Sequence, residues 1–218
     1  MSKIRTLDDL SDGLNQQLAW RKKELSDLKS LLDLSPSNTS RRSVLLRSAI
    51  TILYAHWEGF IKEASSIYLE YVSRQGLRYN QLTNNFIALA FKNQLKLIEE
   101  TQKPCTYTEA LNFITSRLDE HSRLPYEDVI RTESNLSSSV LKEITCILGL
   151  DYSFYELKQE LIDTKLLRQR NAVAHGEYLS IEMEGYSDLH KEVIGMMDEF
   201  KTQVENHACQ RSYQVSSS

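Results

Sequence analysis

The segment from Arg41 to Arg74 constrains the fold more than any other part of this sequence, because its apolar side chains recur every three or four residues without a break. On a single helix, one stripe would carry Leu45, Ala49, Ile52, His56, Phe60, Ala64, Ile67 and Tyr71. At about 1.5 Å per residue, such a helix would span on the order of 50 Å. Gly76 is its predicted stop, since glycine readily adopts the left-handed conformation that ends helices.

The rest of the chain also favours helices. Glycine (7 residues) and proline (3 residues) are scarce among 218 residues, whereas an all-β sandwich needs many turns. An amphipathic helix is expected over 7–34, followed by a loop at 35–40 whose polar side chains can cap the next helix. Further helices are predicted over 86–99, 108–118, 136–150, 154–174 and 187–207, with a loop at 121–133 and a frayed polar tail at 211–218. The sequence therefore predicts an all-α fold.

Charge and cysteine content narrow the classes of function. The formal net charge is −4, so the surface as a whole does not attract polyanions, and any nucleic-acid role must depend on a local basic site. No apolar run approaches the roughly 18–20 residues that span a bilayer, and the first residues lack the apolar region of a secretory signal. Three cysteines, far apart at Cys105, Cys146 and Cys209, fit reduced thiols. We therefore expect a cytoplasmic protein without a membrane partner.

One segment, RQRNAVAHGE at 168–177, carries candidate chemistry. On a helix, Asn171 and His175 are one turn apart, close enough for the amide to orient the imidazole. Arg170 and His175 project roughly 140° apart. They converge only if the helix ends just before His175, if Arg170 reaches around the helix, or if a second subunit completes the site. Gly176 favours the first route, because glycine can occupy the left-handed position after a helix end.

An arginine and a histidine together suffice for metal-free cleavage of RNA. The arginine fork binds phosphate oxygens at any physiological pH. Histidine titrates near neutrality, so it can take the proton of a ribose 2′-hydroxyl or give one to the leaving oxygen. The same spacing also arises by chance, and the structural alternative is a surface arginine beside a histidine that caps a helix. The sequence has no glycine-rich phosphate loop and no Cys-x-x-Cys or His-Glu-x-x-His motif, so no metal and no cofactor are predicted.

The string RNAVAHG at 170–176 resembles the R-N-x-x-x-H signature of the HEPN superfamily, which glycine often follows. The stretch LYAHWEGFIK at 53–62 is similar to stand-alone prokaryotic HEPN proteins of the MAE type. The resemblance covers the chain in helix order and implies a HEPN-like helical bundle with a long central helix. It implies a single domain over 1–218, with a core at about 41–76 and 154–208, an N-terminal helix at 5–34 and a variable helical insertion at about 81–150.

The resemblance also implies a function. Many HEPN proteins are metal-independent endoribonucleases of toxin–antitoxin or phage-defence modules, and they form homodimers in which two motifs face each other. By this resemblance Arg170 would hold the scissile phosphate, His175 would act as general acid or base, and Asn171 would position it. Glu58 or His56 would add a polar contact from the long helix. Other members only bind RNA or partner proteins, so a non-catalytic helical module is the alternative.

Two residues of the long helix can be explained by packing rather than by a functional role. His56 lies on the apolar stripe, where a core histidine with one satisfied hydrogen bond is the simpler interpretation. Gly59 lies inside a helix that otherwise avoids glycine, which suggests the close approach of another helix.

RNA binding by an acidic protein requires a local positive channel. The candidate RNA-binding residues are Lys165 and Arg168 beside the motif, and Arg41, Arg42 and Arg47 at the start of the long helix. One HEPN toxin group carries a tyrosine two residues after the histidine, which its antitoxin modifies. Here Tyr178 comes third after His175, so an antitoxin or defence-system partner that binds the protein directly is at least as consistent with the sequence.

Overall fold

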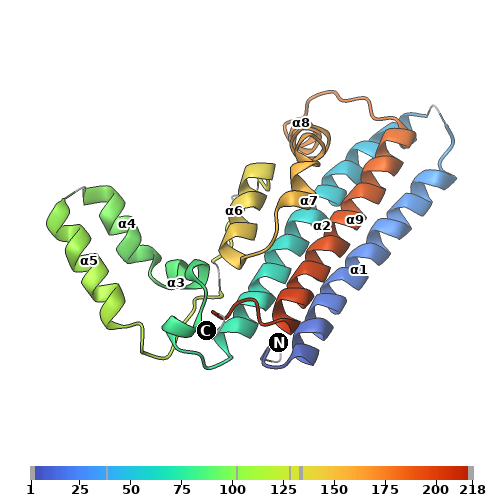
Figure 1. Ribbon diagram of the computed structural model, residues 1–218. Helices are drawn as coiled ribbons and strands as arrows, with labels where there is room; N and C mark the ends of the chain where they lie inside the picture. The colour runs from blue at the N-terminus through green and yellow to red at the C-terminus, as the bar shows by residue number, and fades with distance from the viewer. Residues whose placement is uncertain (1–2, 38, 102, 128, 133–134, 216–218) are drawn as a thin grey trace.

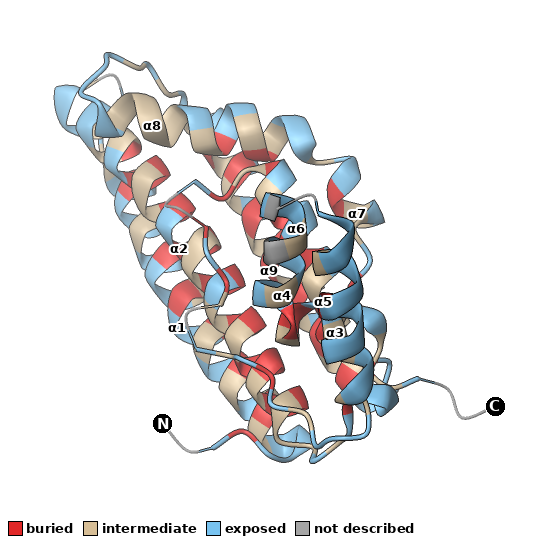
Figure 2. Cartoon of the chain, turned by 90° about the vertical axis from the view of Figure 1, so that its left-hand side faces the viewer, coloured by how far each residue is buried: buried red, intermediate tan, exposed pale blue. Residues whose placement is uncertain are grey.

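Three long helices form the main body of the protein. The computed structural model describes residues 3–37, 39–101, 103–127, 129–132 and 135–215, and these residues form helices and no strand. Helices α1 (Leu7–Leu34), α2 (Ser40–Ser73) and α9 (Met183–Cys209) lie side by side (Figure 1). Their buried residues line the sides that face one another (Figure 2). The predicted all-α fold with a long central helix is therefore confirmed.

Local signals explain where α1 and α2 begin and where α2 ends. Thr6 caps α1 in a capping box with Asp9, and the Thr39 hydroxyl accepts a hydrogen bond from the Arg42 backbone N–H at the start of α2. Shortly after α2 ends, Gly76 adopts a left-handed φ of +69°. The predicted first helix, the capped start of the second and its glycine stop are thus confirmed.

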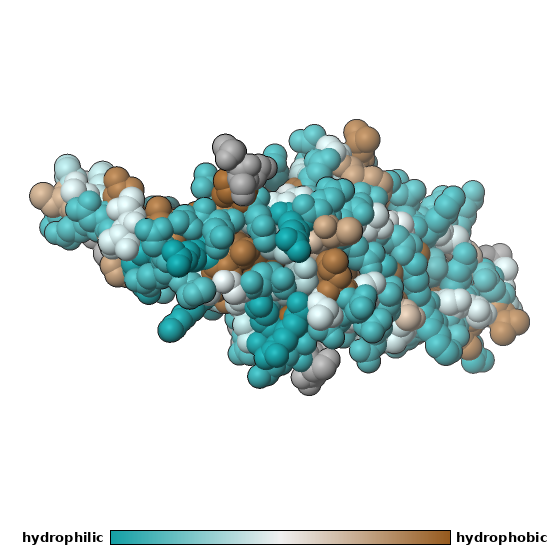
Figure 3. Space-filling view, turned by 60° about the horizontal axis from the view of Figure 1, so that its bottom comes forward, coloured by the Kyte–Doolittle hydropathy of each residue, from teal (hydrophilic) through white to brown (hydrophobic). Residues whose placement is uncertain are grey.

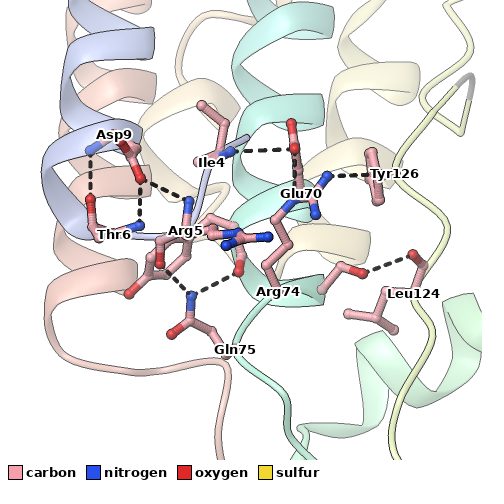
Figure 4. A network of polar contacts seen from close by, with 11 residues as sticks. Ile4, Arg5, Thr6, Asp9, Glu70, Arg74, Gln75, Leu124 and Tyr126 are labelled. Carbon is pink, nitrogen blue, oxygen red and sulfur yellow. Dashed lines mark hydrogen bonds and ion pairs between the residues drawn. The ribbon is translucent and has the colours of Figure 1, made fainter. Parts of the chain in front are cut away.

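A polar network joins the chain's first residues to the end of α2 (Figure 4). Glu70 accepts a hydrogen bond from the Ile4 backbone N–H and pairs with Arg74, whose guanidinium donates to the Tyr126 hydroxyl at 3.1 Å. Gln75 donates to the Arg5 backbone carbonyl. This network fixes the N-terminal segment and the loop before residue 127 to one end of the bundle.

The middle third forms an arm that extends away from the bundle (Figure 1). The predicted single helix over 86–99 is wrong: the chain forms α3 (Asn84–Ala90) and α4 (Lys92–Thr101), because it bends at Phe91 and buries that ring against Tyr79 and Phe113. Helix η1 (Tyr79–Gln81) precedes α3, and α5 (Pro104–Ser116) packs beside α4, whereas α6 (Ser138–Leu148) lies against α2 at the bundle (Figure 1). Gly149 ends α6 with a φ of +73°, as predicted. The described residues of 121–132 form no helix, whereas residues 128 and 133 of the predicted loop lie outside the described residues.

The predicted continuous helix over 154–174 is also wrong. The chain forms α7 (Ser153–Glu156), then a π-helix, η2 (Leu161–Arg168), and then α8 (Gln169–Ala174). A π-helix bonds each N–H five residues back, so it turns less per residue than an α-helix and changes which side chains share a face. π-Helical segments are rare and frequently occur at functional sites.

The end of the chain is packed rather than frayed as far as the structure describes it. Tyr213 is 1% exposed, and its ring meets the Tyr71 ring at right angles, 5.9 Å between centres. The predicted fraying is thus wrong for 211–215, because burial of this aromatic ring anchors the segment; residues 216–218 lie outside the described residues. That the whole chain is one domain with an insertion stays a prediction.

The face in Figure 3 is mostly hydrophilic, and its hydrophobic areas are separated from one another, which is ordinary for a globular protein. None of the helices in the described part of the chain is long and apolar enough to cross a bilayer. Cys105, Cys146 and Cys209 are free and exposed.

Candidate functional site

The R-N-x-x-x-H segment lies on α8, which packs against α2. Arg170 is half-buried, and its guanidinium carbon lies 4.8 Å from the centre of the Tyr54 ring. Tyr54 is 1% exposed, and its hydroxyl accepts a hydrogen bond from the Leu136 backbone N–H. A cation over the face of an aromatic ring is attracted by the ring quadrupole. Tyr54 therefore provides a fixed surface on which the guanidinium rests.

Tyr54 stays neutral at any physiological pH. Burial raises the pKa of its hydroxyl to about 12, and the nearby Glu58 carboxylate adds to the increase. The hydrogen bond from Leu136 and the positive charge of Arg170 act on this pKa in the opposite direction. Arg170 thus packs against an uncharged ring and keeps its own charge available to an anion.

Asn171 orients Arg170 rather than His175. Its side-chain carbonyl oxygen accepts a hydrogen bond from Nη1 of Arg170 at 2.7 Å, and its amide donates to Oδ1 of Asn135 at 3.4 Å. The expected contact between the Asn171 amide and the His175 imidazole is not formed in this structure, because the His175 side chain has no hydrogen bond with any described residue. The two residues are linked only through the backbone, where the His175 N–H donates to the Asn171 carbonyl at 2.9 Å.

His175 is the C-cap of α8, and the helix ends there as the sequence predicts. Gly176 adopts a φ of +76°. Its N–H donates to the Val173 carbonyl, and the Glu177 N–H donates to the Ala172 carbonyl, which is the hydrogen-bond pattern of a Schellman motif. The His175 side chain is exposed and has no hydrogen bond or ion pair with any residue that the structure describes.

Arg170 and His175 face different surroundings within one chain. Because α8 is α-helical from Gln169 to Ala174, the two positions project about 140° apart. Arg170 packs on α2, whereas His175 reaches solvent beyond the helix end. The helix does end before His175, as the first route to convergence requires, but no hydrogen bond among the described residues joins the two side chains or gives them a common partner.

Glu58 and His56 lie on different faces of α2. Glu58 is four residues after Tyr54 on the same face, and one of its carboxylate oxygens is buried without a hydrogen-bond partner among the described residues. His56 instead packs against α1: its Nε2 lies 3.2 Å from a Glu24 carboxylate oxygen, and its ring contacts Trp20. The structure therefore brings Glu58 toward the Arg170 side of α2 and places His56 in the α1 interface, where the structural interpretation of His56 applies.

The close approach predicted at Gly59 is present and is made by a side chain of α1. A Cβ at Gly59 would lie 3.2 Å from Nη2 of Arg21, which is 6% exposed. Burial lowers the pKa of Arg21, and the negative charge of Glu63 opposes that effect. Gly59 therefore serves packing between α1 and α2 rather than the candidate site.

The predicted basic residues divide between two grooves. Arg42 and Arg47 line a groove of about 650 Å³, which we name the α2 groove. It is lined by Ser37, Thr39, Ser40, Arg42, Ser43, Val44, Leu46, Arg47, Tyr178, Ser180, Ile181, Glu182 and Met183. Lys165 lines another groove of about 600 Å³ between η2 and α9, together with Asp188 and Glu192. Both grooves include residues 180–182.

Lys165 therefore lines a different groove from Arg42 and Arg47, and the two grooves share the segment 180–182. Arg41 and Arg168 are exposed, and neither of them lines either groove. Arg47 has a further role, because its Nη2 donates to the Glu177 carbonyl at 2.8 Å and ties the segment after the motif to α2.

Tyr54 and Asn135 contact the motif but were not among the residues that the sequence singled out. For Tyr54 a signal exists, because it is four residues before Glu58 and therefore shares its helix face. Asn135 offers no such signal, since it is 36 positions from Asn171 in a segment without a motif.

Comparison with known protein families supports the resemblance seen in the sequence. The family model described as RiboL-PSP-HEPN matches residues 16–206. The chain therefore belongs to the RiboL-PSP-HEPN family, and membership in the HEPN superfamily is confirmed. The MAE-type subgroup is not identified by this match. No curated protein and no solved structure matches the chain. Family membership indicates a nuclease or an RNA-binding module.

Proposed function

We propose that the protein is a metal-independent endoribonuclease, and that it acts as the toxin or effector of a toxin–antitoxin or phage-defence module. The observation that carries this proposal is Arg170 itself. Its guanidinium is held by the Tyr54 ring and by Asn171, and it has no ion pair among the described residues. An arginine held in this way, with its charge not neutralised, suits the binding of a phosphate.

RNA cleavage of this kind requires a guanidinium that binds the phosphate and a second group that transfers protons. The ribose 2′-oxygen attacks the adjacent phosphorus, so that a P–O2′ bond forms while the P–O5′ bond breaks. His175 takes the 2′-hydroxyl proton or supplies one to the leaving 5′-oxygen. Arg170 stabilises the negative charge on the phosphorane-like transition state. The products are a 2′,3′-cyclic phosphate and a 5′-hydroxyl.

The proposed active unit is a homodimer with a composite site. Arg170 and His175 point to different surroundings in one chain, so a second copy would have to bring the histidine of one subunit to the arginine of the other. Asn171 is a positioning residue for Arg170, and Glu58 supplies a negative charge near Tyr54. A cytoplasmic location and an antitoxin or defence-system partner belong to the same proposal.

A second candidate function is a non-catalytic HEPN module that binds RNA or a protein partner. The separate surroundings of Arg170 and His175 favour it if the protein is monomeric, because no single phosphate then meets both groups. The oligomeric state and a cleavage assay together distinguish the two functions.

The decisive experiment is cleavage of a structured RNA by purified protein in excess chelator. We expect fragments that end in 2′,3′-cyclic phosphate. His175→Ala should lower the rate by about 10²–10⁴, the usual loss for an acid–base group. Arg170→Ala should lower it by about 10²–10³, the usual loss for a donor that stabilises transition-state charge. Helicity by circular dichroism should be unchanged in both variants. Full activity in both variants, or strict dependence on a divalent cation, would contradict the proposal. Binding of RNA without any cleavage would favour the non-catalytic module.

A further inference from the structure

We propose that the α2 groove binds the nucleotides of a single-stranded RNA next to the phosphate held by Arg170, with one base stacked on Tyr178 and the backbone phosphates on Arg42 and Arg47. The inference rests on the proposed function and adds to it the strand state of the substrate and the path that it takes.

Neither arginine of the groove forms an ion pair with a carboxylate of the described residues. Arg42 donates through Nη1 to the Ser35 carbonyl and the Ser37 hydroxyl, and Arg47 donates through Nη2 to the Glu177 carbonyl. Neither forms an ion pair within the described part of the chain, and the Nε of Arg47 is buried without a partner. Neutral oxygens hold both forks in place, so each positive charge remains available to a phosphate.

Hydroxyl groups and one carboxylate complete the polar lining. The hydroxyls belong to Ser37, Thr39, Ser40, Ser43 and Ser180, and the carboxylate is that of Glu182. The groove therefore carries two positive charges against one negative charge, in a chain whose net charge is −4. Hydroxyls and arginine forks are the side chains that contact phosphate and sugar in protein complexes with nucleic acids.

Tyr178 indicates that the groove also binds a nucleotide base. It is 85% exposed and makes no hydrogen bond or ring contact with another described residue, although it lines the same groove as both arginines. An aromatic ring beside a positively charged groove is the combination that binds single strands, because every base has a face that can stack on it. Bases in a duplex are already stacked on one another, so the arrangement selects unpaired nucleotides.

The groove and the candidate site are linked through Arg47 and the segment after His175. Tyr178 is three residues after His175, and Arg47 fixes the backbone between them. Arg47 and Tyr54 are seven residues apart on α2, so they lie on one face of the helix about 10 Å apart along its axis. A strand whose scissile phosphate contacts Arg170 above Tyr54 would therefore pass Arg47 and then reach the ring of Tyr178.

The test measures RNA binding in a variant that cannot cleave. With His175→Ala as background, fluorescence anisotropy gives the dissociation constant for a short, labelled single-stranded RNA. Adding Tyr178→Ala should weaken binding about tenfold, whereas Tyr178→Phe, which keeps the ring, should bind nearly as the background does. An RNA with an abasic nucleotide at the stacked position should bind more weakly and lose its sensitivity to Tyr178→Ala. Arg42→Gln should reduce the slope of log affinity against log salt by about one.

The matched control is Tyr107→Ala, which removes an exposed tyrosine from the arm and should leave binding unchanged. If His175→Ala and the double variant with Tyr178→Ala bind the RNA equally well, the inference is overturned. The proposed ribonuclease function would be unaffected by that result, provided that the wild type still cleaves RNA. Tighter binding of a blunt duplex than of the single strand would also overturn the inference. If the wild type neither binds nor cleaves RNA, the proposed function itself fails.

Discussion

At the scale of single residues, Arg170 shows how a fold can position a cation without neutralising its charge. A carboxylate partner would hold the guanidinium more strongly but would also neutralise it. Here the Tyr54 ring and the Asn171 carbonyl oxygen position the group without cancelling its charge. Glu58 is close enough to influence Tyr54, yet it forms no ion pair with Arg170 in the described part of the chain. The site therefore combines a fixed geometry with a free positive charge.

The role of Tyr54 can be tested by separating its ring from its hydroxyl. Tyr54→Phe keeps the ring under Arg170 but leaves the Leu136 N–H without its partner, so unfolding should become easier by about 1–3 kcal/mol, while cleavage at low temperature stays close to wild type. Tyr54→Leu also removes the ring, and cleavage should fall about tenfold further, as expected when a partly desolvated cation–π contact is lost. Rates measured well below each melting temperature check this. Equal rates for the two variants would exclude a positioning role for the ring.

Three buried or half-buried histidines make stability depend on pH. Burial lowers the pKa of His56, His190 and His207 below the ordinary value of about 6.5. For His56 the positive charge of Arg21 acts in the same direction, and Glu24 opposes it. The unfolded chain therefore binds more protons than the folded one just below pH 6.5, and the free energy of unfolding falls as the pH decreases through that range.

The contribution of His56 can be isolated with a neutral replacement. Urea denaturation of the wild type at pH 7.5 and at pH 5.5 should show a lower midpoint in acid. In His56→Gln the difference between the two pH values should shrink, because glutamine takes up no proton in either state. An unchanged difference would show that His56 has the same proton affinity folded and unfolded.

At the scale of elements, the sequence predicts the long helices well and the short ones poorly. The ends of α1 and α2 follow from local signals, namely Thr6, Thr39 and Gly76. The π-helix η2 could not be predicted, because its two buried residues, Ile162 and Leu166, are four positions apart, a spacing that an ordinary α-helix gives as well. The break at Phe91 depends on aromatic partners that tertiary packing supplies.

In the candidate site, too, local features could be predicted from the sequence, whereas contacts between distant residues could not. The sequence motif identifies Arg170, Asn171 and His175 and predicts the end of α8 at Gly176, since these are local features. The contact of Arg170 with Tyr54 joins residues far apart in the chain, and only the packing of α8 on α2 decides it. The basic residues were found one by one, but their division between two grooves depends on the course of the segment 180–182.

The contact between α1 and α2 at Gly59 gives a prediction at this scale. In Gly59→Leu the new side chain meets Arg21, which Gln17 holds through two hydrogen bonds and which cannot withdraw without losing them. Stability should fall by about 1–3 kcal/mol, as in other overpacked cores. Gly195→Leu is the matched control, because a Cβ at that exposed position on α9 would meet no described atom within 4 Å apart from the neighbouring backbone of its own helix. Its stability should rise by up to about 1 kcal/mol through helix propensity. Urea midpoints that change equally in both variants would contradict the packing role.

At the scale of the whole molecule, the different surroundings of Arg170 and His175 make the oligomeric state a test of the proposed mechanism. If each site takes its arginine from one subunit and its histidine from the other, two inactive variants can restore each other. A mixed dimer of Arg170→Ala and His175→Ala places both defects in one site and leaves the second site intact. Because random exchange makes half of the dimers mixed, about a quarter of wild-type activity should return in a two-fold symmetric dimer.

Subunit exchange would be verified by native mass spectrometry of variants that carry different tags, and cleavage would be followed through the 2′,3′-cyclic phosphate product. A mixture of two differently tagged Arg170→Ala preparations serves as the control and should stay inactive, since every site in it lacks the guanidinium. Recovery in the first mixture alone shows that the two groups act across the interface, because neither variant contains a complete pair. Absence of recovery despite complete exchange would mean that both groups must come from one chain, and α8 would then have to rearrange on binding RNA to bring His175 to the side of Arg170.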